Sequence, residues 1–247
     1  MRYYLTSSEE TQNMLLSRRS AVLSLAGLVA ATKTASAEQE VKPFLTDAEV
    51  PLAKLLSLPG AADSDATKAE LAAVKNYIAT RTEDGAKYAV ADDNVSINHF
   101  LATMSIPIDI FSLAQTKSYF ESLASTVDGV VNPAKQAFNR ARPATLDPSI
   151  TPPLVPKNPL AYPSSHATLG FLYAITLSGI APEKQFAFFA RANGYGYARY
   201  ILGLNFASDV EAGKAAAAAI AAVLWRNADV SKQFAAVKAE LRQAMGL

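Results

Sequence analysis

The chain has 247 residues, with 23 lysines and arginines, 22 aspartates and glutamates, two histidines and no cysteine. This near balance of charge argues against a nucleic-acid partner and against a polybasic attachment to lipid, so any anion site must be local. The lack of cysteine excludes disulfides, a thiolate nucleophile and a thiolate metal site, and two histidines argue against a histidine-rich metal centre. We therefore expect no metal and no cofactor.

The first 37 residues are predicted to be a signal peptide. Arg18 and Arg19 precede an apolar run over residues 21–31, and small residues that suit a signal peptidase follow it. The paired arginines also resemble a twin-arginine signal, so general secretory and twin-arginine export both remain open. Either route predicts a mature domain over residues 38–247 that is periplasmic or secreted. The longest later apolar run, residues 215–225, is shorter than the about 20 residues that cross a bilayer and predicts a buried helix.

Past the signal, the chain is predicted to fold as one mostly helical domain. Capping side chains at residues 63–65, with Leu71, Val74 and Ile78 at helical spacing, predict a helix that ends near Thr80. Further helices are predicted over residues 111–126, 134–140, 165–177, 182–201, 209–225 and 230–245. No stretch shows the alternation of a strand, so the expected fold class is all-α, a single-domain helical bundle.

One long segment, residues 143–163, is predicted to be irregular because proline recurs along it. Its internal prolines are Pro148, Pro152, Pro153, Pro156 and Pro159. A loop of this length inside a compact domain is more often functional than filler. Since it joins two of the three motifs described next, we expect it to pass over the functional pocket.

Three blocks of the chain carry residues suited to a phosphoryl group. They read KQAFNRARP from residue 135, YPSSH from residue 162 and ARYILGLNFASD from residue 198. A phosphoryl group carries negative charge on several oxygens, so its site needs fixed positive groups and backbone donors aimed at one small volume. Lys135, Arg142 and Arg199 can supply the charge, because an arginine fork binds two phosphate oxygens and a lysine acts as a point charge.

The second block predicts the start of a helix that can bind an anion. Ser164 suits the N-cap position, which leaves the amides of Ser165 and His166 without partners inside the helix. Such amides make a helix N-terminus a site for anions. The predicted phosphate-binding set is therefore Lys135, Arg142, Ser164, Ser165 and Arg199.

In order and spacing, the three blocks resemble the K-x6-RP, PSGH and SR-x5-H-x3-D signature of the type 2 phosphatidic acid phosphatase superfamily. They are most similar to its soluble branch, the class A bacterial non-specific acid phosphatases. The resemblance implies a helical bundle of the phosphatidic acid phosphatase and vanadium haloperoxidase type. It also implies that small phosphorylated molecules or inorganic phosphate are the partners. The lipid phosphatases of the superfamily span the membrane repeatedly, which this chain is not expected to do.

The resemblance further implies a role for each residue of the blocks. His166 would protonate the leaving alcohol, Asp209 would orient the nucleophile, and the phosphate-binding set would hold the phosphoryl oxygens. Asn205 stands where the family has the histidine that attacks phosphorus. Ser165 replaces a glycine and Ala198 replaces a serine, two changes expected to alter phosphate binding without abolishing it.

Asn205 leaves two classes of function open, because an amide nitrogen has no free lone pair with which to attack phosphorus. Direct attack by water, with His166 as acid or base, would give an acid phosphatase of weak or altered activity. The alternative is a noncatalytic protein that binds phosphate or phosphoesters. Vanadate haloperoxidase chemistry would need the same missing histidine. The other histidine, His99, lies outside every block and is expected to be a partly buried, hydrogen-bonded side chain.

Overall fold

The computed structural model of the chain describes residues 41–106 and 108–247, and the predicted signal peptide lies outside them. The described residues form one compact unit. They contain α-helices, two short 3₁₀ helices and no strand, so the all-α prediction is confirmed for this part of the chain. Within these described residues, one isolated β-bridge joins Ala141 to Leu160.

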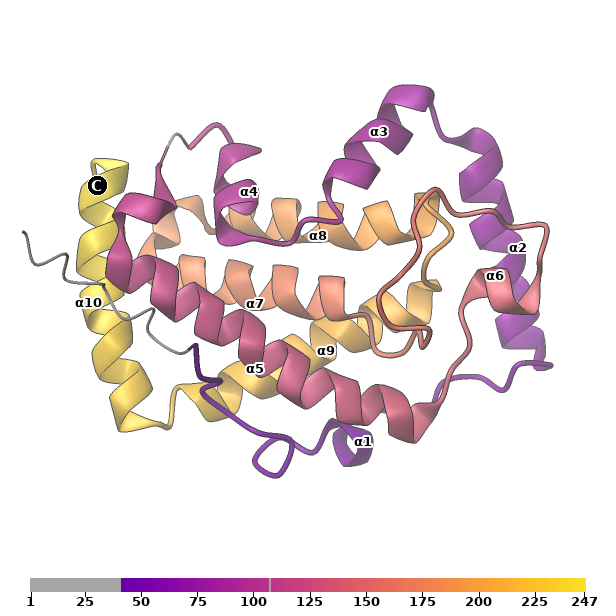
Figure 1. Ribbon diagram of the computed structural model, residues 1–247, viewed down its shortest axis with the longest axis horizontal. Coiled ribbons are helices and arrows are strands. Elements are labelled where there is room, and N and C mark those ends of the chain that lie inside the picture. Colours follow the sequence, from indigo (N-terminus) through magenta and orange to yellow (C-terminus); the bar gives the residue numbers. More distant parts are fainter. Residues whose placement is uncertain (1–40, 107) are drawn as a thin grey trace, which may run out of the picture. The chain divides into compact units, whose positions relative to one another are not determined.

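The helices form a bundle in which α7 lies at the centre (Figure 1). In chain order they are α1 (Leu52–Leu55), α2 (Asp65–Thr80), α3 (Glu83–Ala91), α4 (Ile97–Ala102), η1 (Ile110–Ser112), α5 (Ala114–Phe138), α6 (Pro143–Leu146), α7 (Ser165–Ile180), η2 (Pro182–Lys184), α8 (Gln185–Ile201), α9 (Ala207–Leu224) and α10 (Ala228–Met245). Helix α7 packs on α5, α8, α9 and α10. Over the described residues, every helix is too short or too polar to cross a bilayer.

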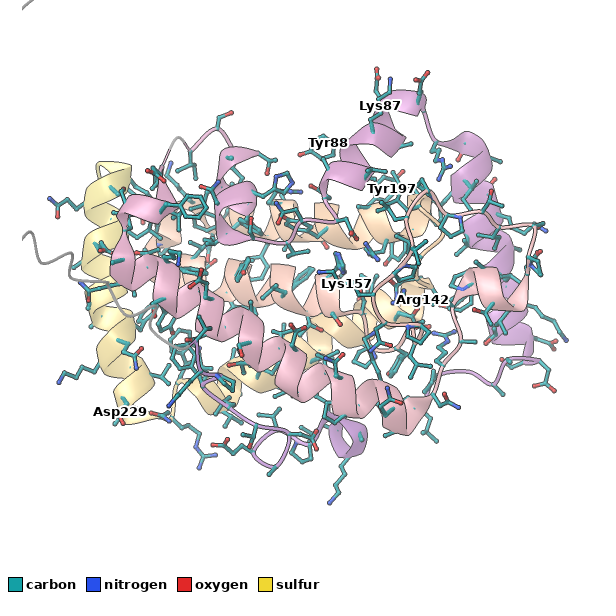
Figure 2. The ribbon with its side chains drawn as sticks, in the orientation of Figure 1. Lys87, Tyr88, Arg142, Lys157, Tyr197 and Asp229 are labelled. Carbon is teal, nitrogen blue, oxygen red and sulfur yellow. The ribbon has the colours of Figure 1, made fainter. Side chains whose placement is uncertain are left out.

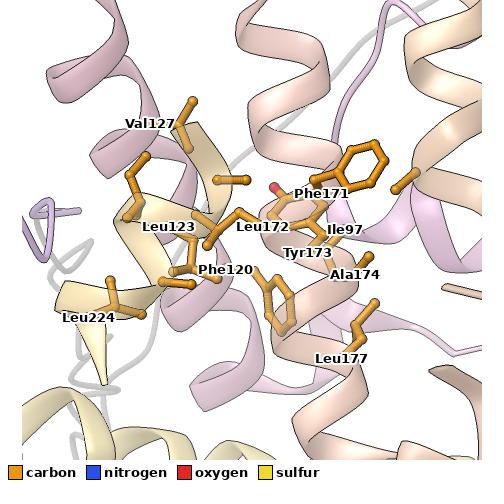
Figure 3. Packing of buried hydrophobic residues seen from close by; sticks show 14 of the residues in the cluster. Ile97, Phe120, Leu123, Val127, Phe171, Leu172, Tyr173, Ala174, Leu177 and Leu224 are labelled. Carbon is orange, nitrogen blue, oxygen red and sulfur yellow. The ribbon is translucent and has the colours of Figure 1, made fainter. Parts of the chain in front are cut away.

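The core lies around α7, which is apolar on most of its circumference, as a central buried helix must be. Leu172 and Leu177 from α7 lie in the same buried cluster as Phe120 and Leu123 from α5 and Leu224 from α9 (Figure 3). Burying one such side chain contributes about 1.5–3 kcal/mol. The cluster therefore fixes α5, α7 and α9 relative to one another, and these helices carry Lys135, Ser165, His166 and Asp209 of the three blocks.

Helix α5 corrects one prediction. The sequence predicted two helices, over residues 111–126 and 134–140, whereas α5 is continuous and contains Pro133. A proline inside a helix removes a hydrogen bond and costs about 3 kcal/mol. Val130 and Ala134, on either side of it, are fully buried, and the packing of this face offsets the cost.

The other predicted elements are close to the observed ones. The helix ending near Thr80 is α2, and the last four predicted helices correspond to α7, η2 with α8, α9 and α10. The sequence missed α3 and α4, which are too short to show a clear apolar period. The segment 143–163 is irregular as predicted, except for the single turn of α6. Pro143 begins that turn, where its missing N–H has no intrahelical partner to lose.

Two glycines bring the second and third blocks together. At Gly213 of α9, a β-carbon would lie 2.7 Å from the carbonyl oxygen of Ser164 and 2.8 Å from the β-carbon of Ala167. Only glycine therefore lets α9 approach the first turn of α7 this closely. Gly203 has a φ of 70°, in the left-handed region that favours glycine, and it directs the chain from the end of α8 towards Asn205.

Candidate active site

A cavity of about 540 Å³ gathers most of the residues predicted to form the site. Those that line it are Lys135, Arg142, Ser165, His166, Arg199 and Asn205. The other two, Ser164 and Asp209, are buried, and the backbone N–H of Ser164 donates to the carbonyl of Asp209 at 2.9 Å. The irregular segment contributes Pro156, Lys157 and Asn158 to the wall, as expected; Lys157 and Arg142 are labelled in Figure 2. The structure thus brings the three blocks to one place.

Lys135 is fixed by backbone oxygens. Its Nζ donates to the carbonyls of Leu160, Ala161 and Pro163 at 3.1, 3.1 and 2.7 Å. Burial, followed by the positive charge of Arg142, lowers the pKa of Lys135 to about 7. The three acceptors match the three hydrogens of the ammonium form and favour it. Lys135 can therefore give the cavity positive charge, while its hydrogen bonds hold the end of the loop over residues 160–163.

Arg142 and Arg199 are joined through the side chain of Asn205. The Asn205 Oδ1 accepts from Nη1 of Arg142 at 3.3 Å and from Nε of Arg199 at 3.4 Å. Arg142 also donates to the carbonyls of Leu204, at 2.6 Å, and Asn158, at 3.0 Å. Within the described residues, nothing accepts a hydrogen bond from Nη2 of either arginine. Each guanidinium therefore keeps one terminal nitrogen for a ligand oxygen.

Asp209 holds the other side of Asn205. The Nδ2 of Asn205 donates to Asp209 Oδ2 at 3.2 Å and to the carbonyl of Ala161 at 2.9 Å. Asp209 Oδ2 also accepts the backbone N–H of Phe206 at 2.8 Å, which caps the start of α9. Burial raises the pKa of Asp209, and the charge of Arg140 opposes this shift. Asn205 thus uses both acceptor positions and both donors of its amide.

Arg140 and Glu70 belong to this site and were missed by the sequence analysis. Arg140 Nη1 donates to Asp209 Oδ1 at 2.6 Å, and its Nη2 pairs with Glu70 Oε2 at 2.7 Å. Glu70 also accepts from the N–H and hydroxyl of Ser208 at 2.7 and 2.9 Å. The guanidinium of Arg140 lies 4.3 Å from the centre of the Phe206 ring. The position of Arg140 in the first block, two residues before Arg142, could have identified it as a site residue. Nothing in the sequence points to Glu70.

The start of α7 has the predicted cap. Ser164 Oγ accepts from the N–H of Ala167 at 3.3 Å, so Ser164 is the N-cap. The amides of Ser165 and His166 precede the first intrahelical donor and have no carbonyl four residues back to bind within α7. Both residues line the cavity. An anion there would meet backbone donors as well as the two arginines.

His166 is paired with a residue that the sequence analysis missed, Asp93. The Nε2 of His166 lies 3.1 Å from Asp93 Oδ1 and 3.2 Å from the Asp93 carbonyl oxygen. Burial lowers the pKa of His166, as does the charge of Arg199, and Asp93 opposes both. The hydrogen bond from His166, with that from Arg199, holds the pKa of Asp93 well below its usual range. His99 lies outside the cavity, is partly buried and pairs with Asp92 at 3.0 Å, as expected of a structural histidine.

The comparisons with known proteins agree with the three blocks. Residues 116–232 match the PAP2 superfamily. A non-specific acid phosphatase of Providencia stuartii is 36% identical over 80 residues, 32% of this chain and 32% of that protein. A non-specific acid phosphatase of Salmonella typhimurium is 33% identical over 118 residues, 46% of this chain and 47% of that protein. An acid phosphatase of Zymomonas mobilis is 31% identical over 84 residues, 34% of this chain and 32% of that protein. The matches thus span between about a third and a half of these relatives.

Among solved structures, the chain is similar to a transmembrane PAP2 type phosphatidylglycerolphosphate phosphatase from Bacillus subtilis. The TM-score is 0.47 at 20% identity, over 71% of this chain and 90% of that one. Residues 116–232 include all three blocks and the cavity residues from Val127 of α5 to Asn205. Residues 116–232 of this chain are therefore similar to the PAP2 superfamily, and parts of the chain are similar to bacterial non-specific acid phosphatases.

Proposed function

We propose that this chain is an exported acid phosphatase-like protein that binds phosphate monoesters in the cavity and hydrolyses them weakly. The observation that carries the proposal is the convergence of Arg142, Arg199 and the first turn of α7 on one cavity with His166. Homology to non-specific acid phosphatases supports the substrate class. The proposal includes a signal peptide over residues 1–37 and a mature domain, periplasmic or secreted, over the rest.

The phosphoryl group would bind through donors that the fold leaves free. Two of its oxygens would accept from Nη2 of Arg142 and of Arg199, and a third from the amides of Ser165 and His166. Lys135 adds charge through space, because its hydrogens are held by backbone carbonyls. Charge-assisted hydrogen bonds of this kind contribute about 1.5–3 kcal/mol each.

Hydrolysis would use water, because Asn205 has no nucleophilic nitrogen. The water oxygen forms a bond to phosphorus while the bond from phosphorus to the ester oxygen breaks. The ester oxygen keeps the electron pair and takes a proton from His166, and the attacking water loses a proton to solvent. His166 then regains its proton from solvent. Positioning and charge alone would drive this step, so the expected rate is low.

A second function is favoured by the contacts of Asn205. All four hydrogen-bonding positions of its amide are occupied by Arg142, Arg199, Asp209 and Ala161. The amide therefore ties the two arginines to the rest of the site without placing any nucleophile. A noncatalytic protein that binds phosphate or phosphoesters would keep this arrangement.

Phosphate release from an aryl phosphate distinguishes the two functions. The mature protein is expected to release phosphate slowly but faster than buffer, and His166→Ala should lower that rate by about 10²- to 10⁴-fold or to background, through loss of leaving-group protonation. His99→Gln is the matched control, since His99 lies outside the cavity, and its rate should equal that of the parent. A parent rate equal to buffer would reject hydrolysis and leave the binding function.

A further inference from the structure

The turn between α3 and α4 carries two neighbouring carboxylates with different surroundings. Asp92 is almost fully buried and accepts two hydrogen bonds from Arg191, at 2.8 and 2.6 Å, and one from His99 at 3.0 Å. The guanidinium of Arg191 also lies 4.0 Å from the centre of the Tyr195 ring. Asp92 therefore anchors the turn to α8. The next residue, Asp93, lines the cavity instead.

Asp93 contacts two residues of the proposed phosphate site at once. Its Oδ1 accepts from Nη1 of Arg199 at 2.8 Å and lies 3.1 Å from Nε2 of His166. The Asp93 carbonyl oxygen is also 3.2 Å from that nitrogen. A carboxylate and a carbonyl oxygen can only accept, so Nε2 of His166 must carry a hydrogen. The nitrogen that remains for proton exchange with a ligand is Nδ1.

We propose that Asp93 is a positioning residue that holds His166 through Nε2, presents Nδ1 to the ester oxygen, and fixes Arg199 beside it. The proposal rests on the proposed function of the cavity. During hydrolysis the proton on Nδ1 would pass to the ester oxygen as the bond to phosphorus breaks, while Nε2–H stays on Asp93. Asp93 itself would not touch the substrate. Its part resembles that of any carboxylate that orients a catalytic imidazole and fixes its tautomer.

The charges around His166 make the effect of Asp93 measurable. Arg199 from α8, Lys135 from α5, Arg142 before α6 and Lys157 from the loop line the cavity with His166, and burial and the charge of Arg199 disfavour its imidazolium form. Among the described residues, Asp93 is the carboxylate within hydrogen-bond distance of His166; Asp128 of α5 also lines the cavity but makes no such bond. Neutralising Asp93 should therefore lower the pKa of His166 by about one unit or more.

Nuclear magnetic resonance can test this directly, because the chain has only two histidines. We expect the His166 ring of Asp93→Asn to titrate at a pH lower by about one unit or more than that of the parent. The His99 ring, which pairs with Asp92, is an internal reference and identifies the two signals when His99→Gln is measured. Asp229→Asn makes the same charge change at an exposed position on α10, far from Arg142 in Figure 2, and should leave His166 unchanged.

The tautomer of His166 in the parent protein gives a second test that needs no variant. Ring nitrogen shifts should show the neutral imidazole with its hydrogen on Nε2, and a hydrogen on Nδ1 would overturn the proposal. An unchanged His166 titration in folded Asp93→Asn would overturn it too. Tungstate binding separates this failure from that of the function. If the parent binds tungstate but the His166 titration is the same in Asp93→Asn, only the role of Asp93 is refuted. If the folded parent binds no tungstate, the role of Asp93 and the proposed function of the cavity are both refuted.

Discussion

Replacing Asn205 with histidine is expected to raise the rate of aryl phosphate hydrolysis by several orders of magnitude. An imidazole nitrogen can attack phosphorus, whereas the amide cannot. In a serine protease, loss of the nucleophile from a cooperating set lowers the rate on the order of a million-fold, so restoring one can have an effect of this scale. Asn205 lines the cavity, and we expect the two side chains to be similar enough in size for the pocket to persist.

The residues around position 205 are already arranged for an imidazole. Asn205 Nδ2 donates to Asp209 Oδ2 at 3.2 Å, and an imidazole N–H can make the same bond. Asp209 cannot turn away, because its other oxygen is held by Arg140 at 2.6 Å. Arg142 and Arg199 would lose the Oδ1 acceptor, but a bound phosphoryl group would replace it. The orienting carboxylate is thus fixed before any nucleophile is added.

Two variants control this experiment. Asn205→Gln keeps an amide and should show no gain in rate. Adding His166→Ala to Asn205→His should lower the restored rate by about 10²- to 10⁴-fold, since the leaving alcohol loses its acid. If Asn205→His folds normally, binds tungstate and hydrolyses no faster than the parent, the roles assigned to Asn205 and Asp209 are wrong.

Replacing Arg191 with methionine is expected to destabilise the fold by about 3–5 kcal/mol, which is the usual cost of leaving a buried charge without its partner. Asp92 is 1% exposed and would keep only His99. Methionine matches the aliphatic part of arginine, so the loss comes mainly from the charge. For a chain of this size the melting temperature should fall on the order of 10 °C in a thermal unfolding experiment.

The matched control is Arg242→Met, which removes an ion pair of the same type at the surface. Arg242 pairs with Glu183 at 2.9 Å, and both side chains are partly exposed. Solvent and salt screen such pairs, so this variant should unfold close to the parent temperature. Equal melting temperatures for the two variants would show that the Asp92–Arg191 pair does not anchor the turn.

Much of the site could be predicted because the three blocks fix local geometry. A serine before a helix start caps it wherever that helix packs, so Ser164 and the amides after it followed from YPSSH alone. The four-residue spacing of Asn205 and Asp209 likewise spans the start of α9, where the Asp209 carboxylate accepts a hydrogen bond from Asn205 Nδ2. The continuous helix α5 was missed, because the packing on both sides of Pro133 is a tertiary effect.

The partners of these residues could not be predicted, since they come from distant parts of the chain. Asp93 reaches Arg199 across 106 positions and Arg140 reaches Glu70 across 70, and no local pattern marks either pair. Lys135 shows the same limit. The position of Lys135 in the first block implied that it binds phosphate oxygens directly. Its ammonium group instead donates to backbone carbonyls at the end of the loop, residues 160–163. Which groups accept hydrogen bonds from Lys135 depends on the tertiary position of that loop, which the sequence does not reveal.

The charges of the cavity also predict how oxyanion binding depends on pH. In the free protein Lys135 loses its proton as the pH rises through about 7, because burial and Arg142 lower its pKa from the ordinary 10.5. A bound dianion would favour the ammonium form and raise that pKa again. The protein should therefore take up protons when an oxyanion binds at about pH 8. Its affinity for the oxyanion should fall as the pH rises from about 6 to about 8.

Calorimetric titration of the mature protein with tungstate tests the central claim most directly, namely that Arg142, Arg199 and the start of α7 form a phosphoryl site. We predict one site, with an affinity that falls as the pH rises and proton uptake that appears as a buffer-dependent heat. Arg199→Gln should bind about tenfold to a hundredfold more weakly, as loss of one charge-assisted contact implies, while the exposed Arg226→Gln should bind like the parent. Absence of binding by the folded parent, or equal affinity in Arg199→Gln, would contradict the account.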